Sequence, residues 1–114
     1  MKKATPDRAS ILQGTLDMLI LRALLTGPTH GHAITKYIQR TSDEMLQVDH
    51  GSLYPALHRL VKNAWISARW EYSKERNREF KYYRLTPLGR KQLVREHSKW
   101  TQMAAAIHRV MNQA

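Results

Sequence analysis

The sequence has no cysteine and few acidic residues. Without cysteine, its 114 residues cannot form disulfides, iron–sulfur clusters, thiolate nucleophiles or zinc sites with cysteine ligands. Nine acidic residues stand against nineteen lysines and arginines, which gives a formal net charge of +10 and an isoelectric point near 10.3. Such a basic domain usually binds a polyanion, most often nucleic acid and less often an anionic membrane. A charged surface that only solvates the protein is the alternative.

Long hydrophobic runs are also missing. The most apolar stretch, Leu16 to Leu25, is short and contains Asp17 and Arg22. No small-residue cleavage site follows it, so we expect neither a signal peptide nor a membrane span, and we expect a cytoplasmic protein. The six histidines lack metal-binding spacing, and no nucleophile–base pair or phosphate loop occurs. We therefore expect no metal, no cofactor and no enzymatic activity.

The first half of the chain predicts three helices. A capping box at Ser10 and Gln13 opens an apolar helix, which Gly27-Pro28 ends. A second helix follows Thr29-His30-Gly31, and a third, capped by Gly51 or Ser52, runs to about Asn63. The residues expected on the buried stripe of the third helix are Leu53, Leu57, Leu60 and Val61.

The second half predicts a β-hairpin and one long helix. Polar and apolar residues alternate over 66–72 and 80–85 around the polar loop 73–78, and Thr86-Pro87 then begins a helix that reaches about Met111. This order predicts a mainly α fold with a small β-hairpin. We expect a winged helix-turn-helix over residues 1–85, with a flexible N-terminus (1–9) and a wing (66–85). A C-terminal dimerisation helix is expected over 86–114.

The outer face of the third helix is polar and basic. It consists of Ser52, Tyr54, Pro55, His58, Arg59 and Lys62. Such a face suits a helix in the major groove of DNA, although similar faces also occur on merely solvated helices. The hairpin tip adds Lys74, Arg76 and Arg78, which suit the backbone or the minor groove, or protect a strand edge from aggregation. We expect both sets of residues to bind DNA.

These motifs resemble those of the PadR family of winged-helix repressors. The resemblance covers about residues 11–100. It rests on Gly14-Thr15-Leu16, Gly51-Ser52-Leu53-Tyr54-Pro55-Ala56-Leu57, Arg59-Leu60, Tyr82-Tyr83-Arg84-Leu85-Thr86 and Gly89. It implies a homodimeric regulator of the short subfamily, usually a repressor that a small molecule releases, and half-sites of the ATGT/ACAT kind. Two positions depart from the family pattern. His32 stands in place of a tyrosine, and Ala64 in place of a glycine, which leaves Asn63 to adopt any left-handed cap.

The last helix carries a heptad-like apolar seam, which predicts a dimer. It consists of Leu93, Trp100, Met103, Ile107 and Val110. Trp100 has two open interpretations: packing between subunits, or the floor of a pocket for a planar aromatic or phenolic effector. By resemblance, Met18 and Arg22 join Leu93, Trp100 and Met103 around such a pocket.

Two other functions remain open. A winged-helix module can bind RNA or a protein without any effector, although a protein-docking surface has no need of a basic third helix. A basic protein at a membrane surface is disfavoured, because no helix pairs a basic face with an exposed Trp/Leu face.

Overall fold

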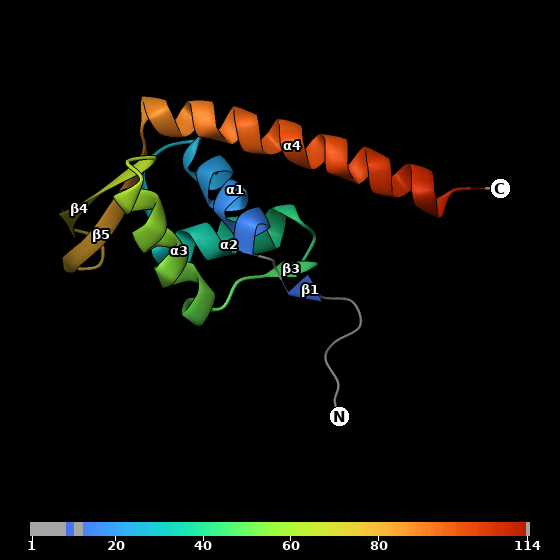
Figure 1. Cartoon of the computed structure of the whole chain (residues 1–114). Helices are drawn as coiled ribbons and strands as arrows, with labels where there is room; N and C mark the ends of the chain where they lie inside the picture. The colour runs from blue at the N-terminus through green and yellow to red at the C-terminus, as the bar shows by residue number, and fades with distance from the viewer. Residues whose placement is uncertain (1–8, 11–12, 114) are drawn as a thin grey trace.

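A computed structural model describes residues 9–10 and 13–113. Its helices are α1 (Gln13–Leu24), α2 (Gly31–Thr41), α3 (His50–Lys62) and α4 (Pro87–Met111). Its strands are β1 (Ala9–Ser10), β2 (Thr29–His30), β3 (Leu46–Gln47), β4 (Ile66–Ser73) and β5 (Arg78–Leu85). The expected flexible N-terminus (1–9) lies outside the described residues except for Ala9, which forms β1 with Ser10 and pairs with Leu46. Ser10, expected to open the capping box of the first helix, is therefore in a strand, and the expected helical residues 11–12 lie outside the described residues. The mainly α fold with a hairpin is confirmed (Figure 1).

The hydrophobic core surrounds α1, because this helix is apolar on several sides. Leu16, Ile20 and Leu21 are buried, and they pack with apolar side chains of α2, α3, the hairpin and α4. Burying one such side chain contributes about 1.5–3 kcal/mol. The predicted stripe of α3 was wrong at one position: Val61 is exposed and Ala56 is buried in its place. The buried residues of α3 therefore follow the i, i+3, i+4, i+7 spacing of one helix face.

The start of α3 lies earlier than the sequence predicted. Asp49 caps the helix, since its Oδ1 accepts a hydrogen bond from the backbone N–H of Ser52 at 2.8 Å, so the expected cap at Gly51 or Ser52 was wrong. A carboxylate suits this end because it also interacts favourably with the helix dipole. Pro55 consequently lies inside the helix, where it cannot donate the usual bond to the carbonyl four residues earlier.

The hairpin belongs to a three-stranded antiparallel sheet of order β2-β5-β4. Ser73 pairs with Arg78, so the connecting loop has four residues, Lys74 to Asn77. The third strand, β2, pairs Thr29 with Tyr83 and His30 with Tyr82. A strand of two residues is too short to show an alternating pattern, so this strand could not be predicted from the sequence. It places the beginning of α2 against the wing.

The turn between α3 and β4 is a Schellman motif. The N–H of Ala64 donates to the carbonyl of Val61 at 2.9 Å, and that of Trp65 donates to the carbonyl of Leu60 at 3.0 Å. The left-handed residue is Ala64, with φ of 62°, whereas Asn63 has φ of −84°. The expectation that Asn63 would take this conformation was wrong, because the hydrogen bonds require it one residue later.

The beginning of α4 is fastened to this turn. The hydroxyl of Thr86 donates to the carbonyl oxygen of Ala64 at 2.7 Å and accepts from the N–H of Gly89 at 2.9 Å. A Cβ at Gly89 would lie 1.9 Å from the carbonyl oxygen of Trp65, so only glycine permits this approach. The first half of α4 then packs on α1, and its second half extends beyond the other elements (Figure 1).

Candidate nucleic-acid interface

The outward face of α3 is exposed at five of its six predicted positions. Exposed are Ser52, Tyr54, Pro55, His58 and Lys62. Arg59 differs, because its guanidinium lies 2.7 Å from Asp17 of α1 and its side chain is only about one-third exposed. Burial raises the pKa of the Asp17 carboxyl, and the hydrogen bond and charge of Arg59 oppose that rise. Arg59 therefore holds α3 against α1.

The wing carries its three predicted cations at or beside the loop. Lys74 and Arg76 lie in the loop, and Arg78 begins β5. The Arg78 guanidinium lies 4.5 Å from the centre of the Phe80 ring and that of Arg76 lies 5.7 Å from it. Cation–π attraction at these distances favours one arrangement of the two side chains.

His30 joins the wing to α2, a role that the sequence did not reveal. Its ring is stacked on Phe80 with the ring centres 5.1 Å apart, and its Nδ1 accepts a hydrogen bond from the N–H of Ala33 at 3.3 Å. Burial lowers the pKa of His30, and the positive charges of Arg76 and His32 lower it further. The proton-free Nδ1 is the form that can cap α2. Ser, Thr, Asp and Asn are the usual caps, so sequence reasoning passed over this histidine.

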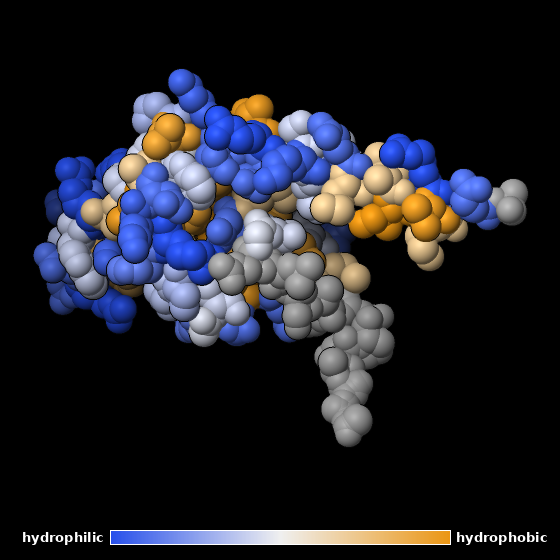
Figure 2. All heavy atoms as spheres, in the orientation of Figure 1, coloured by the Kyte–Doolittle hydropathy of each residue, from blue (hydrophilic) through white to orange (hydrophobic). Residues whose placement is uncertain are grey.

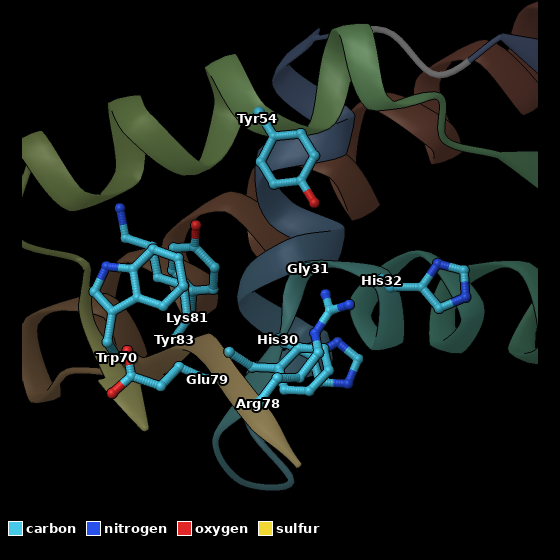
Figure 3. Close-up of a pocket in the computed structure, with 10 residues that line it drawn as sticks. His30, Gly31, His32, Tyr54, Trp70, Arg78, Glu79, Lys81 and Tyr83 are labelled. Carbon is cyan, nitrogen blue, oxygen red and sulfur yellow. The ribbon is translucent and has the colours of Figure 1, made fainter. Parts of the chain in front are cut away.

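A cleft of about 350 Å³ separates α3 from the wing (Figure 3). It is lined by His30, Gly31, His32, Tyr54, Trp70, Arg78, Glu79, Phe80, Lys81 and Tyr83. Tyr54 points from α3 into this space, above Gly31, whose missing Cβ would lie 3.2 Å from the tyrosine hydroxyl (Figure 3). Burial raises the pKa of Tyr83, as does the neighbouring Tyr54. Predicted residues of the helix and of the wing thus face each other across one space.

A separate groove with basic side chains lies between α2 and the wing. Its volume is about 540 Å³, and Lys36, Arg40 and Arg76 are among its lining residues. Lys36 and Arg40 belong to α2 and were not among the predicted DNA contacts. Only the fold shows that they lie beside the wing loop.

An apolar groove of about 570 Å³ lies on the other side of the fold, between α1 and α4. Met18, Arg22, Leu93 and Trp100, four of the five predicted effector contacts, line it, and Met103 does not. His97 joins Arg22 there, and among the described residues no acidic side chain lines the groove. The fold therefore brings two predicted residues of α1 and two of α4 to the same groove, as a common binding pocket would require.

The seam of α4 is exposed where the helix leaves the core. Trp100, Met103, Ile107 and Val110 expose about half or more of their surface. Leu93 is 9% exposed and packs in the chain's own core, so the structure separates it from the rest of the seam. Figure 2 shows the corresponding apolar patch on the projecting half of the helix.

The family model of PadR-like transcriptional regulators matches residues 20–95. The chain belongs to this PadR-like family. Its fold is similar to that of a transcriptional regulator from Clostridium thermocellum, with 30% identity, a TM-score of 0.77, and coverage of 85% of this chain and 93% of that one. A PadR family regulator from Eggerthella lenta is 25% identical with a TM-score of 0.74, over 90% and 86% of the two chains. A protein of unknown function from Lysinibacillus sphaericus is 30% identical over 100 residues, 88% of this chain and 91% of its own.

Membership of the PadR family confirms the winged helix-turn-helix and the prediction of a transcriptional regulator that acts by binding DNA. The family is one of regulators, not of enzymes. In the part of the chain that the structure describes, no helix is long and apolar enough to cross a membrane. Over those same residues, no three His, Asp or Glu side chains are grouped closely enough to hold a metal ion.

Proposed function

We propose that this PadR-family chain is a repressor that binds an inverted repeat in double-stranded DNA as a homodimer. The observation that carries the proposal is the arrangement of the exposed face of α3 and the basic wing on opposite sides of one cleft. In the proposed complex, Ser52 and Tyr54 reach base edges in the major groove. Lys62 contacts phosphate, and the wing enters the minor groove with Arg76 near the backbone.

Residues 86–114 act as the dimerisation helix in this proposal. Trp100, Met103, Ile107 and Val110 form an apolar seam that nothing in the described chain covers. A two-fold axis through paired seams presents two copies of α3, whose half-sites are then expected about one helical turn, roughly 10 base pairs, apart. An apolar seam on one side of a long helix is typical of helix pairing.

A small planar aromatic compound is the proposed effector, bound in the groove between α1 and α4. The Trp100 indole offers a stacking surface worth about 0.5–1.5 kcal/mol beyond the buried area. Arg22 supplies a fixed positive charge to the groove, and no acid among the described residues opposes it there, so a phenolic carboxylate is favoured over a cationic dye. The ligand releases DNA only if it binds one dimer shape more tightly than the other. The favoured shape must hold the two copies of α3 at a spacing that does not match the two half-sites.

The central experiment is selection of duplex DNA on the purified protein, followed by binding measurements at several salt concentrations. We expect an inverted repeat to be recovered and its affinity to fall steeply with salt. Ser52→Ala and Tyr54→Ala should weaken specific binding more than non-specific binding. Arg76→Ala should weaken both and lower the salt slope by about one.

Lys91→Ala is the matched control for the loss of one positive charge. Lys91 is exposed on α4 and lines neither the cleft between α3 and the wing nor the groove between α2 and the wing. This variant should therefore bind as the wild type does. Sequence-specific binding would be contradicted if the selection recovered no common sequence. It would also be contradicted if Ser52→Ala and Tyr54→Ala weakened specific and non-specific binding equally, as Arg76→Ala is expected to do.

The effector is tested separately by quenching of tryptophan fluorescence with phenolic acids and planar dyes. Trp65 and Trp70 also fluoresce, so Trp100→Phe is the control that isolates the groove. Quenching that persists in Trp100→Phe places the ligand elsewhere and refutes the groove as the effector site.

A further inference from the structure

Trp70 is the most exposed tryptophan of the chain, at 61%, although it lies on the core-facing side of its strand. Side chains two residues apart share one face of a strand, so Trp70 continues the line of buried Ile66 and half-buried Ala68. The hairpin projects beyond the core at this point, and the indole consequently lines the cleft below α3 (Figure 3).

Lys81 accompanies Trp70 in the cleft. The two residues are register partners on β4 and β5, so their side chains stand next to each other on the same face of the sheet. Arg78 adds a second positive charge to the lining, which also includes His30 and His32, and Glu79 is the one acid there among the described residues. The cleft therefore combines a flat apolar surface with an excess of positive charge.

A sugar–phosphate strand of B-DNA would lie between α3 and the wing if both elements entered adjacent grooves. A single sugar–phosphate strand separates each major groove from the adjacent minor groove. A protein that inserts a helix into one groove and a wing into the other must straddle that strand. The cleft is the space between those two elements here, and its chemistry suits the strand: deoxyribose presents apolar C–H groups, and phosphate presents negative charge.

We propose that the cleft holds one sugar–phosphate backbone of the duplex, with the Trp70 indole packed on deoxyribose and the Lys81 ammonium paired with phosphate. This inference rests on the proposed binding of DNA by α3 and the wing. Contacts of this kind carry no sequence information and instead set the position of the protein on the duplex. Trp70 and Lys81 are thus positioning residues for the base contacts that α3 makes.

The test compares Trp70→Ala, Lys81→Ala and the control Leu88→Ala. Leu88 is a similarly exposed apolar side chain, at 51%, but it lies on α4 and does not line the cleft. Binding of the selected duplex and of a scrambled duplex is measured by fluorescence anisotropy from 50 to 200 mM salt. Thermal melts of each variant verify the fold, and Trp70→Phe serves as a second, conservative variant.

Trp70→Ala should weaken binding of both duplexes equally, by about fivefold to tenfold, without changing the salt slope. Lys81→Ala should weaken both and lower the slope by about one. Trp70→Phe should restore part of the lost affinity, and Leu88→Ala should bind as the wild type does. In an ethylation-interference experiment, Lys81→Ala should lose its sensitivity at one phosphate in each half-site.

The outcomes separate this inference from the proposed function. A wild-type protein that binds no duplex refutes the proposed function itself. If the wild type binds but Trp70→Ala and Lys81→Ala keep full affinity for both duplexes, the cleft does not hold the backbone, and the exposed indole serves a protein partner or none. A loss confined to the selected duplex makes Trp70 a base contact and also overturns the inference.

Discussion

At the scale of single residues, Ala64 holds a backbone conformation that suits glycine. Its φ of 62° is imposed by the two hydrogen bonds that end α3, and a side chain makes that conformation costly. We predict that Ala64→Gly stabilises the protein by about 0.5–1 kcal/mol, because relief of this strain exceeds the added freedom of the unfolded chain. Urea unfolding measures the change. Asn63→Gly is the control, since φ at Asn63 is already ordinary, and an equal gain there would contradict the explanation.

Gly89 is the opposite case, a glycine that cannot be replaced. A Cβ there would lie 1.9 Å from the backbone carbonyl oxygen of Trp65, and a backbone atom cannot move aside as a flexible side chain can. We predict that Gly89→Ala destabilises the fold by about 2–3 kcal/mol, as overpacking does. The control is Gly14→Ala on α1, where an added Cβ meets nothing within 4 Å among the described residues. Equal melting temperatures for the two variants would disprove the close approach of α4.

At the scale of elements, the cap of α2 depends on an unprotonated His30. Folding lowers the pKa of His30 from its ordinary value of 6.5. As the pH falls below 6.5, His30 therefore binds a proton less readily in the folded state than in the unfolded state. The contribution of His30 is therefore complete above pH 6.5 and is lost as the pH falls toward its lower folded pKa. Protonation also adds a positive charge beside Arg76, Arg78 and His32.

We predict that the wild type loses more stability between pH 7.5 and pH 5.5 than His30→Asn does. Asparagine can still cap the helix but does not titrate in this range, so its comparison with the wild type removes the effect of the other histidines. Unfolding by urea at both pH values gives the change in the free energy of unfolding for each protein. An identical change in the wild type and in His30→Asn would show that protonation of His30 is not linked to folding.

At the scale of the whole molecule, the protein has more apolar surface than one copy of the chain covers. The projecting half of α4 exposes its seam, and the groove between α1 and α4 is open. We predict a dimer of about 27 kDa, twice the 13.3 kDa of the chain, at micromolar concentration. Ile107→Glu with Val110→Glu should give a monomer, because each substitution would bury an unpaired charge.

Sedimentation equilibrium measures both masses. Arg109→Glu is the control on the same turn of α4, and it should remain a dimer because Arg109 lies outside the seam. A monomeric wild type, or a dimer that survives the double substitution, would refute the proposed role of α4.

Local sequence pattern was sufficient for most elements and for the exposed faces. The two-residue alternation of β4 and β5, the Thr86-Pro87 start of α4 and the apolar spacing of α3 are short-range signals, and each predicted an element that the structure contains. The basic face of α3 and the cations of the wing could be predicted for the same reason, since a helix or strand alone decides which side chains share a face.

Features that depend on contacts between distant segments became visible only in the folded chain. The pairing of Arg59 with Asp17, the strand at Thr29–His30 and the cleft that joins Tyr54 to Trp70 link residues far apart in the chain, and no local period encodes such contacts. The left-handed cap at Ala64 and the burial of Leu93 within its own chain have the same origin. Each follows from where one element packs on another, which the sequence specifies only through the complete fold.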